Sequence, residues 1–196
     1  MATISEIRTC RQIRSTAAGF QAREEGGPII EGYFSVFNSD YPLWPGAAEQ
    51  IAPGAFRETL GGDIRALADH DTRLVLGRTT AGTLALREDE KGLFGTIKIN
   101  EADGDAMNLY ARVQRGDVSQ CSFGFDILDE EYIENPSDGS CLWIIRKVKL
   151  YEVSVVTFPA YVETSVEARR HDYDTIRRRK LDTWKNDMKE RLHNGT

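Results

Sequence analysis

The chain has 196 residues, 40% of them hydrophobic, enough for the core of one domain of ordinary size with an appendage. A net charge of −6 gives no global positive field to attract nucleic acid, and no run of about 18 apolar residues could span a membrane. Cys10, Cys121 and Cys141 lack C-x-x-C spacing, which argues against a disulfide framework and a zinc site. The first residues lack the apolar segment of a secretory signal. We therefore expect a soluble protein of a reducing cytoplasm with no metal, cofactor, nucleic acid or membrane partner.

The first part of the chain is predicted to begin with a β-hairpin. Residues 13–23 and 29–37 have strand patterns and flank a glycine- and proline-containing turn at residues 24–28. Residues 38–51 carry two prolines and a glycine, which is typical of a loop. Residues 53–60 begin with proline and are followed by two glycines, and this pattern predicts a short helix.

Residues 63–71 form a mostly apolar strand pattern that ends in three ionisable residues, Asp69, His70 and Asp71. His70 is the only histidine before the tail of the chain. A lone histidine at a strand end is more often a surface residue than a catalyst, but a neighbouring carboxylate can hold an imidazole in one tautomer and raise its basicity. Both interpretations stay open for His70 at this point.

Residues 74–78, 82–89 and 93–100 continue the β pattern, and residues 102–115 then change to a helical period. The apolar stripe of this predicted helix consists of Ala106, Leu109, Tyr110 and Val113. Gly116 follows as the expected C-cap.

The strand predicted after this helix carries a candidate nucleophile, Ser122. Side chains in a strand alternate between faces, so the apolar residues of this strand are expected to face the core. These residues are Cys121, Phe123, Phe125 and Ile127. Ser122 lies on the other face beside Gly124, whose missing side chain leaves room for a backbone or a ligand, whereas Ser119 has the parity of the core face. The alternative for Ser122 is a polar residue on a solvated strand face.

The last part of the predicted domain contains two further strands. Residues 129–139 are acidic and rich in turn formers, which predicts a surface turn, and a strand at 141–150 follows them. Residues 151–157 are rich in β-branched residues, with Glu152 and Ser154 on one face. A buried Glu152 would need a partner, whereas on an edge strand it would be solvated, and periodicity leaves both open.

Residues 167–196 form a separate tail after a domain at residues 1–166. Basic residues outnumber acidic ones in the tail, and apolar residues recur there at near-helical spacing. These residues are Ile176, Leu181, Trp184, Met188 and Leu192. The pattern predicts a charged amphipathic helix, which either folds back onto the domain or serves as a partner-binding arm.

His70, Ser122 and Glu152 come from three separate strand patterns and together supply the groups for nucleophilic acyl transfer. Serine needs a base to remove its proton, histidine suits that task near neutral pH, and a carboxylate can orient the imidazole. The sequence contains no G-x-S-x-G elbow, Walker loop, dinucleotide fingerprint or metal-ligand cluster that would favour another chemistry.

Several short stretches then occur in a characteristic order along the chain. They are Pro53-Gly54-Ala55-Phe56, Asp69-His70-Asp71 with Leu76-Gly77 behind it, Gly92-Leu93, Cys121-Ser122-Phe123-Gly124-Phe125, and the run from Leu150 to Tyr161. In this order they resemble the prohead proteases of HK97-type tailed bacteriophages, over about residues 32–166. The order makes the resemblance specific, because each stretch alone would be a weak signal.

The resemblance implies an α+β, mainly β fold like that of herpesvirus maturational proteases: an antiparallel β-barrel with peripheral helices. It implies a serine endopeptidase that cleaves the scaffolding region of the phage major capsid protein, and itself, inside the immature prohead in the host cytoplasm. His70 would be the general base and Ser122 the nucleophile.

Herpesvirus enzymes use a second histidine as the third member of the triad, and this chain has no second histidine before its tail. We choose Glu152, with Asp69, Asp71 and Ser154 as alternatives. A catalytically idle scaffold or assembly factor and a small-molecule serine hydrolase are the competing functions. Homo-oligomerisation, cleavage-site preference and the oxyanion-hole donors stay open.

Overall fold

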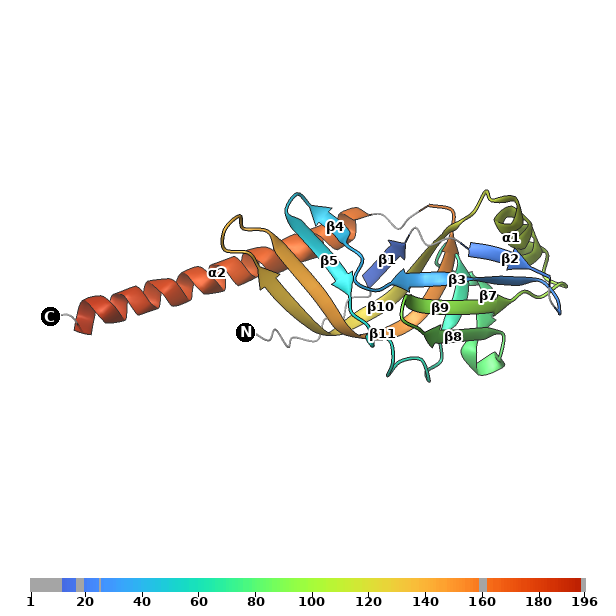
Figure 1. Cartoon of the computed structure of the whole chain (residues 1–196), viewed down its shortest axis with the longest axis horizontal. Coiled ribbons are helices and arrows are strands. Elements are labelled where there is room, and N and C mark those ends of the chain that lie inside the picture. The colour runs from blue at the N-terminus through green and yellow to red at the C-terminus, as the bar shows by residue number, and fades with distance from the viewer. Residues whose placement is uncertain (1–11, 17–19, 25, 159–161, 195–196) are drawn as a thin grey trace. The chain divides into compact units, whose positions relative to one another are not determined.

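The computed structural model describes residues 12–16, 20–24, 26–158 and 162–194. The chain divides into two compact units, Met1–Ala160 and Tyr161–Thr196. Within the described residues the first unit is mainly β with one α-helix, and the second consists of one long helix (Figure 1). The mainly β, α+β class predicted from the sequence is thereby confirmed.

Within the described part of the chain, the larger of two sheets has seven strands and contains both long strands. Its strands are β1 (Gln12–Thr16), β4 (Tyr41–Trp44), β5 (Ala47–Ile51), β6 (Arg65–Ala68), β7 (Asp71–Arg78), β10 (Gln120–Glu134) and β11 (Cys141–Val156). The order β1-β10-β11-β5-β4 forms the main path, and β6 pairs with β11 and with β7. β10 and β11 form a long antiparallel hairpin that places Ser122 opposite Ser154.

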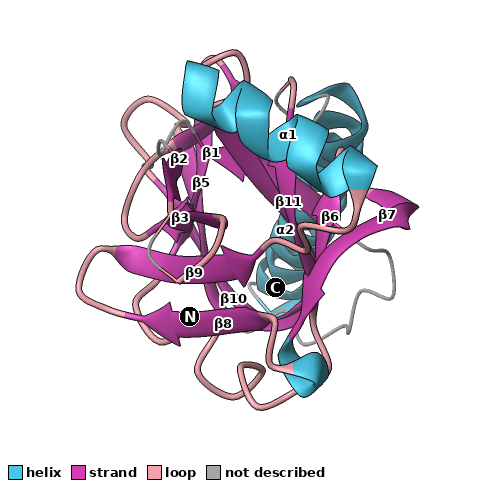
Figure 2. Ribbon diagram, turned by 90° about the vertical axis from the view of Figure 1, so that its right-hand side faces the viewer, coloured by secondary structure: helices cyan, strands magenta, loops and turns pink. Residues whose placement is uncertain are grey.

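The second sheet has four antiparallel strands in the order β2-β3-β9-β8. They are β2 (Phe20–Arg23), β3 (Ile29–Val36), β8 (Leu84–Glu88) and β9 (Gly92–Lys98). Helix α1 (Gly104–Arg115) contacts β2 and β3 of this sheet and β7 of the larger one, so it bridges the two (Figure 2). A short 3-10 turn, η1 (Thr79–Ala81), follows β7.

The apolar face of β10 lies in the core, as the alternation predicts. Cys121, Phe123, Phe125 and Ile127 are all buried. Phe123 stacks on Phe125 with ring centroids 4.8 Å apart and meets the edge of Phe56 at 5.5 Å. Aromatic pairs at these separations add to the burial of apolar area. The segment that carries Ser122 is therefore held rigidly from its core side.

The helix predicted at residues 102–115 is confirmed as α1, with nearly the same bounds. Asp103 is its N-cap and accepts hydrogen bonds from the backbone N–H groups of Asp105 and Ala106. Gly116 ends the helix with φ +88°, the left-handed conformation that glycine adopts most easily.

The predicted helix at residues 53–60 is wrong, because the chain forms successive turns there. Backbone N–H groups bond to the carbonyl three residues earlier, as from Arg57 to Gly54 and from Thr59 to Phe56. Gly54 has φ +88°, which is incompatible with a right-handed helix at that position.

The predicted loop at residues 38–51 is also wrong, since it contains β4 and β5. In β5, Ala47, Glu49 and Ile51 are buried and alternate with half-buried residues, while both prolines lie in or beside the edge strand β4. Edge strands tolerate proline because one side of the backbone needs no ladder partner. The residues predicted as a surface turn at 129–139 include the end of β10, which runs to Glu134.

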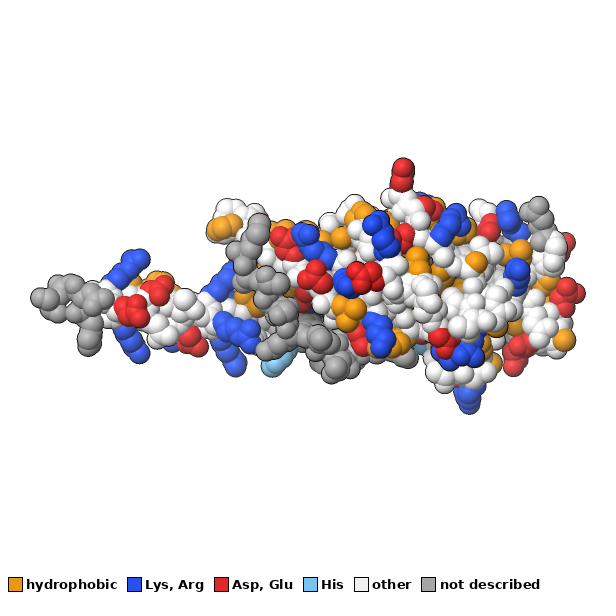
Figure 3. Space-filling view, turned by 90° about the horizontal axis from the view of Figure 1, so that it is seen from below, with side chains coloured by type: hydrophobic (Ala, Val, Ile, Leu, Met, Phe, Trp, Pro, Cys, Tyr) orange, Lys and Arg blue, Asp and Glu red, His pale blue; other side chains and the backbone are white. Residues whose placement is uncertain are grey.

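The closed antiparallel barrel expected from the resemblance is not found among the described strands. They form two separate sheets, and β11 pairs with β5 and β6 in parallel. The surface of the first unit mixes basic and acidic side chains on the face shown in Figure 3.

The second unit is helix α2 (Val162–Asn194), so the predicted C-terminal helix is confirmed and begins before residue 167. Leu181, Trp184, Met188 and Leu192 are exposed along it. Among the described residues, no helix combines the length and apolar character needed to cross a membrane.

Candidate active site

Ser122 lies in the middle strand of three, between β1 and β11. Its register partners are Ser15 on β1 and Ser154 on β11. It is fully buried, so the alternative of a polar residue on a solvated strand face is wrong. Its hydroxyl donates a hydrogen bond to the backbone oxygen of Arg14, at 2.8 Å. Ser119 precedes the strand and is exposed, so the alternation that placed it toward the core does not extend to it.

Glu152 is buried in β11, with 4% of its surface exposed, and it is paired. Its Oε1 lies 2.8 Å from Nδ1 of His70, and its Oε2 accepts a hydrogen bond of 2.6 Å from the Ser154 hydroxyl. Of the two possibilities that the sequence left open, the structure therefore selects the buried and paired one.

Gly124 explains how the Glu152 side chain fits against β10. The two residues are register partners, and a Cβ atom at Gly124 would overlap Oε1 of Glu152. The space predicted beside Ser122 for a backbone or a ligand is thus occupied by the Glu152 carboxylate.

His70 occupies a two-residue turn between β6 and β7. Ala68 pairs with Asp71, and the two turn residues, Asp69 and His70, have φ +47° and +60°. Tight hairpins favour this mirror-image turn because it matches the twist of the strands, but residues other than glycine adopt it only when their surroundings hold them. The Asp69 side chain fixes the turn, because its carboxylate accepts hydrogen bonds from Thr157 N at 2.7 Å and from Thr157 Oγ1 at 3.1 Å.

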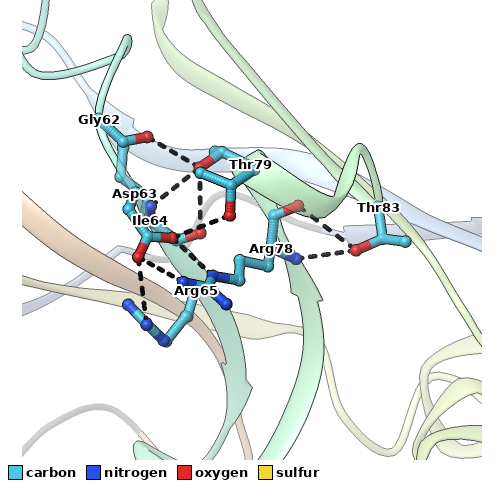
Figure 4. A network of polar contacts seen from close by, with 8 residues as sticks. Gly62, Asp63, Ile64, Arg65, Arg78, Thr79 and Thr83 are labelled. Carbon is cyan, nitrogen blue, oxygen red and sulfur yellow. Dashed lines mark hydrogen bonds and ion pairs between the residues drawn. The ribbon is translucent and has the colours of Figure 1, made fainter.

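The other end of the β6–β7 hairpin is closed by a polar network around Asp63 (Figure 4). Arg78 donates from Nε and Nη2 to the Asp63 carboxylate, both at 2.7 Å, and Arg65 donates at 3.2 Å. The hydrogen bond from Arg78 holds the pKa of the Asp63 carboxyl well below its ordinary value. The Thr79 hydroxyl accepts a hydrogen bond of 2.9 Å from Ile64 N, which connects the residue before β6 to the residue after β7. The hairpin that presents His70 is therefore fixed at both ends.

The aspartates beside His70 are both engaged with other residues. Asp71 accepts from the backbone and guanidinium of Arg73, which lowers the pKa of its carboxyl to about 2. Asp69 binds Thr157, as described above. Ser154 contacts Glu152 rather than the imidazole. The carboxylate in contact with the His70 ring is that of Glu152, which agrees with the contact predicted from the strand face.

The hydrogen bonds determine what the imidazole can do. A carboxylate oxygen only accepts, so Nδ1 of His70 carries the hydrogen and Nε2 of the neutral ring is left as an acceptor. Nε2 is buried and has no hydrogen-bond partner among the described residues. This is the tautomer that a general base requires.

Among the described residues, no hydrogen bond joins Ser122 to His70. The hydroxyl hydrogen of Ser122 is directed to the backbone oxygen of Arg14, and Nε2 of His70 has no hydrogen-bond partner in the described part of the chain. Catalytic contacts are often long in resting enzymes and tighten with substrate. The sequence analysis did not identify Arg14 as a neighbour of Ser122. A basic residue in a strand pattern does not reveal which distant residues it contacts.

Comparisons with known proteins agree with the arrangement of motifs. Residues 16–179 match the family described as caudovirus prohead serine protease. The prohead protease of Enterobacteria phage HK97 is 33% identical over 147 residues, which cover 72% of this chain and 60% of that protein. The prohead protease of Escherichia phage T5 is 30% identical over 116 residues, covering 57% of this chain and 50% of that protein. The chain thus spans about half to three fifths of the length of these relatives.

Among solved structures, the capsid assembly protease gp21 of bacteriophage T4 aligns with a TM-score of 0.47 at 14% identity. The alignment covers 76% of this chain and 98% of the T4 chain.

Proposed function

Because the chain belongs to the caudovirus prohead serine protease family, we propose that it is a serine endopeptidase of capsid maturation. Its substrate is the scaffolding region of the phage major capsid protein, and it also cleaves itself. It acts inside the immature prohead, in the host cytoplasm. The region matched by the family, residues 16–179, includes all three proposed catalytic residues: His70, Ser122 and Glu152.

The proposed mechanism assigns one role to each of the three. His70 takes the hydroxyl proton of Ser122 on Nε2 while Oγ forms a bond to the scissile carbonyl carbon. Glu152 keeps the ring in the required tautomer and stabilises the imidazolium that results. His70 then gives the proton to the leaving amine as the peptide bond breaks. Water, activated by the same base, hydrolyses the acyl-enzyme.

The observation that carries this proposal is the partly buried contact of 2.8 Å between His70 Nδ1 and Glu152 Oε1. The contact satisfies a carboxylate that would be costly to bury alone. It leaves Nε2 of His70 as a buried acceptor without a partner among the described residues. A general base requires an acceptor that is kept available in this way, and a purely structural role does not call for one. This favours the protease over an idle scaffold with the same fold.

The proposal is tested by co-expressing the protein with its capsid protein and following the capsid protein by intact mass. Ser122→Ala should abolish processing, because the attacking atom is gone. The matched control is Ser119→Ala, which removes an exposed hydroxyl three residues away and should process normally. Processed product with Ser122→Ala would show that the nucleophile is another residue, and uncleaved shells with the wild type would favour the idle scaffold.

A further inference from the structure

The segment of β10 that holds Ser122 lies between two strands. One of them is short, and another peptide strand can take its place. On one side it pairs with β11, a strand of 16 residues that carries Glu152 and Ser154. On the other side it pairs antiparallel with β1, five residues long, which forms the edge of the sheet. Extended peptides bind proteins by adding a strand to such an edge. β1 therefore occupies the position where a peptide chain could align with the nucleophile.

β1 also blocks the chemistry of Ser122. A hydroxyl has one hydrogen, and Ser122 gives it to the backbone oxygen of Arg14, so it is not offered to Nε2 of His70. Ser122 is fully buried in this arrangement. A substrate carbonyl can reach the serine only after β1 has left.

The Arg14 side chain is held in a pocket built for a guanidinium. Its Nε and Nη2 donate to the two carboxylate oxygens of Glu49 on β5, at 2.5 and 2.9 Å, and both side chains are almost completely buried, 3% and 1% exposed. The guanidinium lies over the rings of Tyr41 and Phe125, at 5.4 and 5.8 Å from their centroids. Two-point binding to a carboxylate combined with aromatic contact is a geometry that arginine fits and neutral side chains do not.

When β1 leaves, Glu49 loses this guanidinium. A buried carboxylate without its partner is strongly disfavoured, so an incoming strand that supplies another arginine is favoured over one that does not. We propose, on the basis of the proposed function, that the edge of β10 beside Ser122 is a binding site for an extended peptide segment that carries an arginine. β1 is the chain's own occupant of this site, with Arg14 in the pocket formed by Glu49, Tyr41 and Phe125.

The first test locks β1 in place without touching the buried pair. Thr16 and Cys121 are register partners on β1 and β10. Residues directly opposite in an antiparallel pair have Cα atoms about 4.5–5.5 Å apart, a separation that a disulfide spans. Thr16→Cys should therefore form a disulfide with the native Cys121. Labelling of Ser122 by a fluorophosphonate should be at least about tenfold slower in the oxidised than in the reduced form, because only the reduced form can open. Thr16→Ser, treated in the same way, is the control.

The second test examines the arginine pocket. Arg14→Gln should label about tenfold faster than the wild type, because β1 is less firmly held. A peptide with the sequence Gln-Ile-Arg-Ser-Thr, that of residues 12–16, should slow this labelling, and a peptide with leucine in place of arginine should not. In the double variant Arg14→Gln/Glu49→Gln the two peptides should act alike.

Equal labelling of the oxidised and reduced Thr16→Cys forms would overturn the inference and leave the proposed function standing. Equal effects of the two peptides on Arg14→Gln would overturn the arginine selectivity. Absence of labelling at Ser122 in every form, wild type included, would contradict the proposed function itself, and this inference would fall with it.

Discussion

The Glu152 carboxylate holds two donors at once: the His70 ring at Oε1 and the Ser154 hydroxyl at Oε2. The contact with His70 could be predicted from the sequence, because a glutamate within a β-branched run needs a partner if it is buried. The role of Gly124, which leaves room for the Glu152 carboxylate, could not be predicted. Its position opposite Glu152 depends on the register of β10 and β11, which contains irregularities directly after Gly124. Such irregularities shift pairings without a reliable signal in the sequence.

Glu152→Gln should lower kcat with little change in KM, because an amide can present its NH₂ group to the ring and favour the wrong tautomer. The loss should reach up to about 10⁴-fold, the size of the effect when the carboxylate of a trypsin-like triad is changed to an amide. Peptide-cleavage kinetics would measure it, with the exposed Glu90→Gln as control. A kcat within about twofold of the wild type would show that Glu152 does not orient the base.

Gly124→Ala should reduce kcat by about 10²-fold while the protein stays folded. The added Cβ would overlap Glu152 Oε1 and displace the carboxylate from His70, and small displacements of catalytic groups have effects of this size. Gly104→Ala is the matched control, because a Cβ there meets open space. Kinetics and thermal melting should be measured together. Full activity in Gly124→Ala would mean that the carboxylate position is not critical.

At the scale of elements, the β6–β7 hairpin presents His70 and the β10–β11 hairpin presents Ser122 and Glu152. Helix α1 and the core face of β10 were predictable because their periodicity is regular and their ends carry caps or aromatic residues. The strand pair β4–β5 was not, since prolines and glycine dominate its local pattern while its pairing with β11 is a long-range contact. The short helix predicted at residues 53–60 failed because proline followed by glycine also begins a series of turns.

Asp63→Asn should weaken the hairpin in a pH-dependent way. The carboxyl's pKa is lowered by Arg78 in the folded protein, so its stabilising effect is present above the unfolded carboxyl's pKa and is lost as the pH falls through the lower folded value. Because the pair is exposed, the effect should be small and should weaken further in salt. The measurement is the Tm of both proteins across this pH range at low salt. A Tm difference that grows on acidification would contradict the sign of this linkage.

At the scale of the whole molecule, the chain consists of a mainly β unit and a helical one. The family could be inferred from the order of its motifs, and residues 16–179 match that family. The closed barrel inferred from the same resemblance is not found among the strands that the structure describes. Short motifs do not reveal how strands that are distant in the sequence pair. The boundary proposed after residue 166 remains a prediction.

Truncation after Lys180 should leave peptide cleavage intact and abolish entry into proheads. It keeps the whole family-matched region and removes four exposed apolar residues from the described part of α2, which we expect to contact a partner. Those residues are Leu181, Trp184, Met188 and Leu192. The truncated protein should be compared with the full chain in peptide cleavage and in co-assembly with the capsid protein. Normal entry into proheads would refute the role of this segment.

The central claim is that Ser122 is the nucleophile and that His70, oriented by Glu152, activates it. The most direct measurement is peptide mapping by mass spectrometry after reaction with a fluorophosphonate, in the wild type and in His70→Ala. The account predicts an adduct on Ser122 in the wild type and a rate of labelling lower by several orders of magnitude in His70→Ala. An adduct on a different serine, or equal labelling of Ser122 in both proteins, would contradict it.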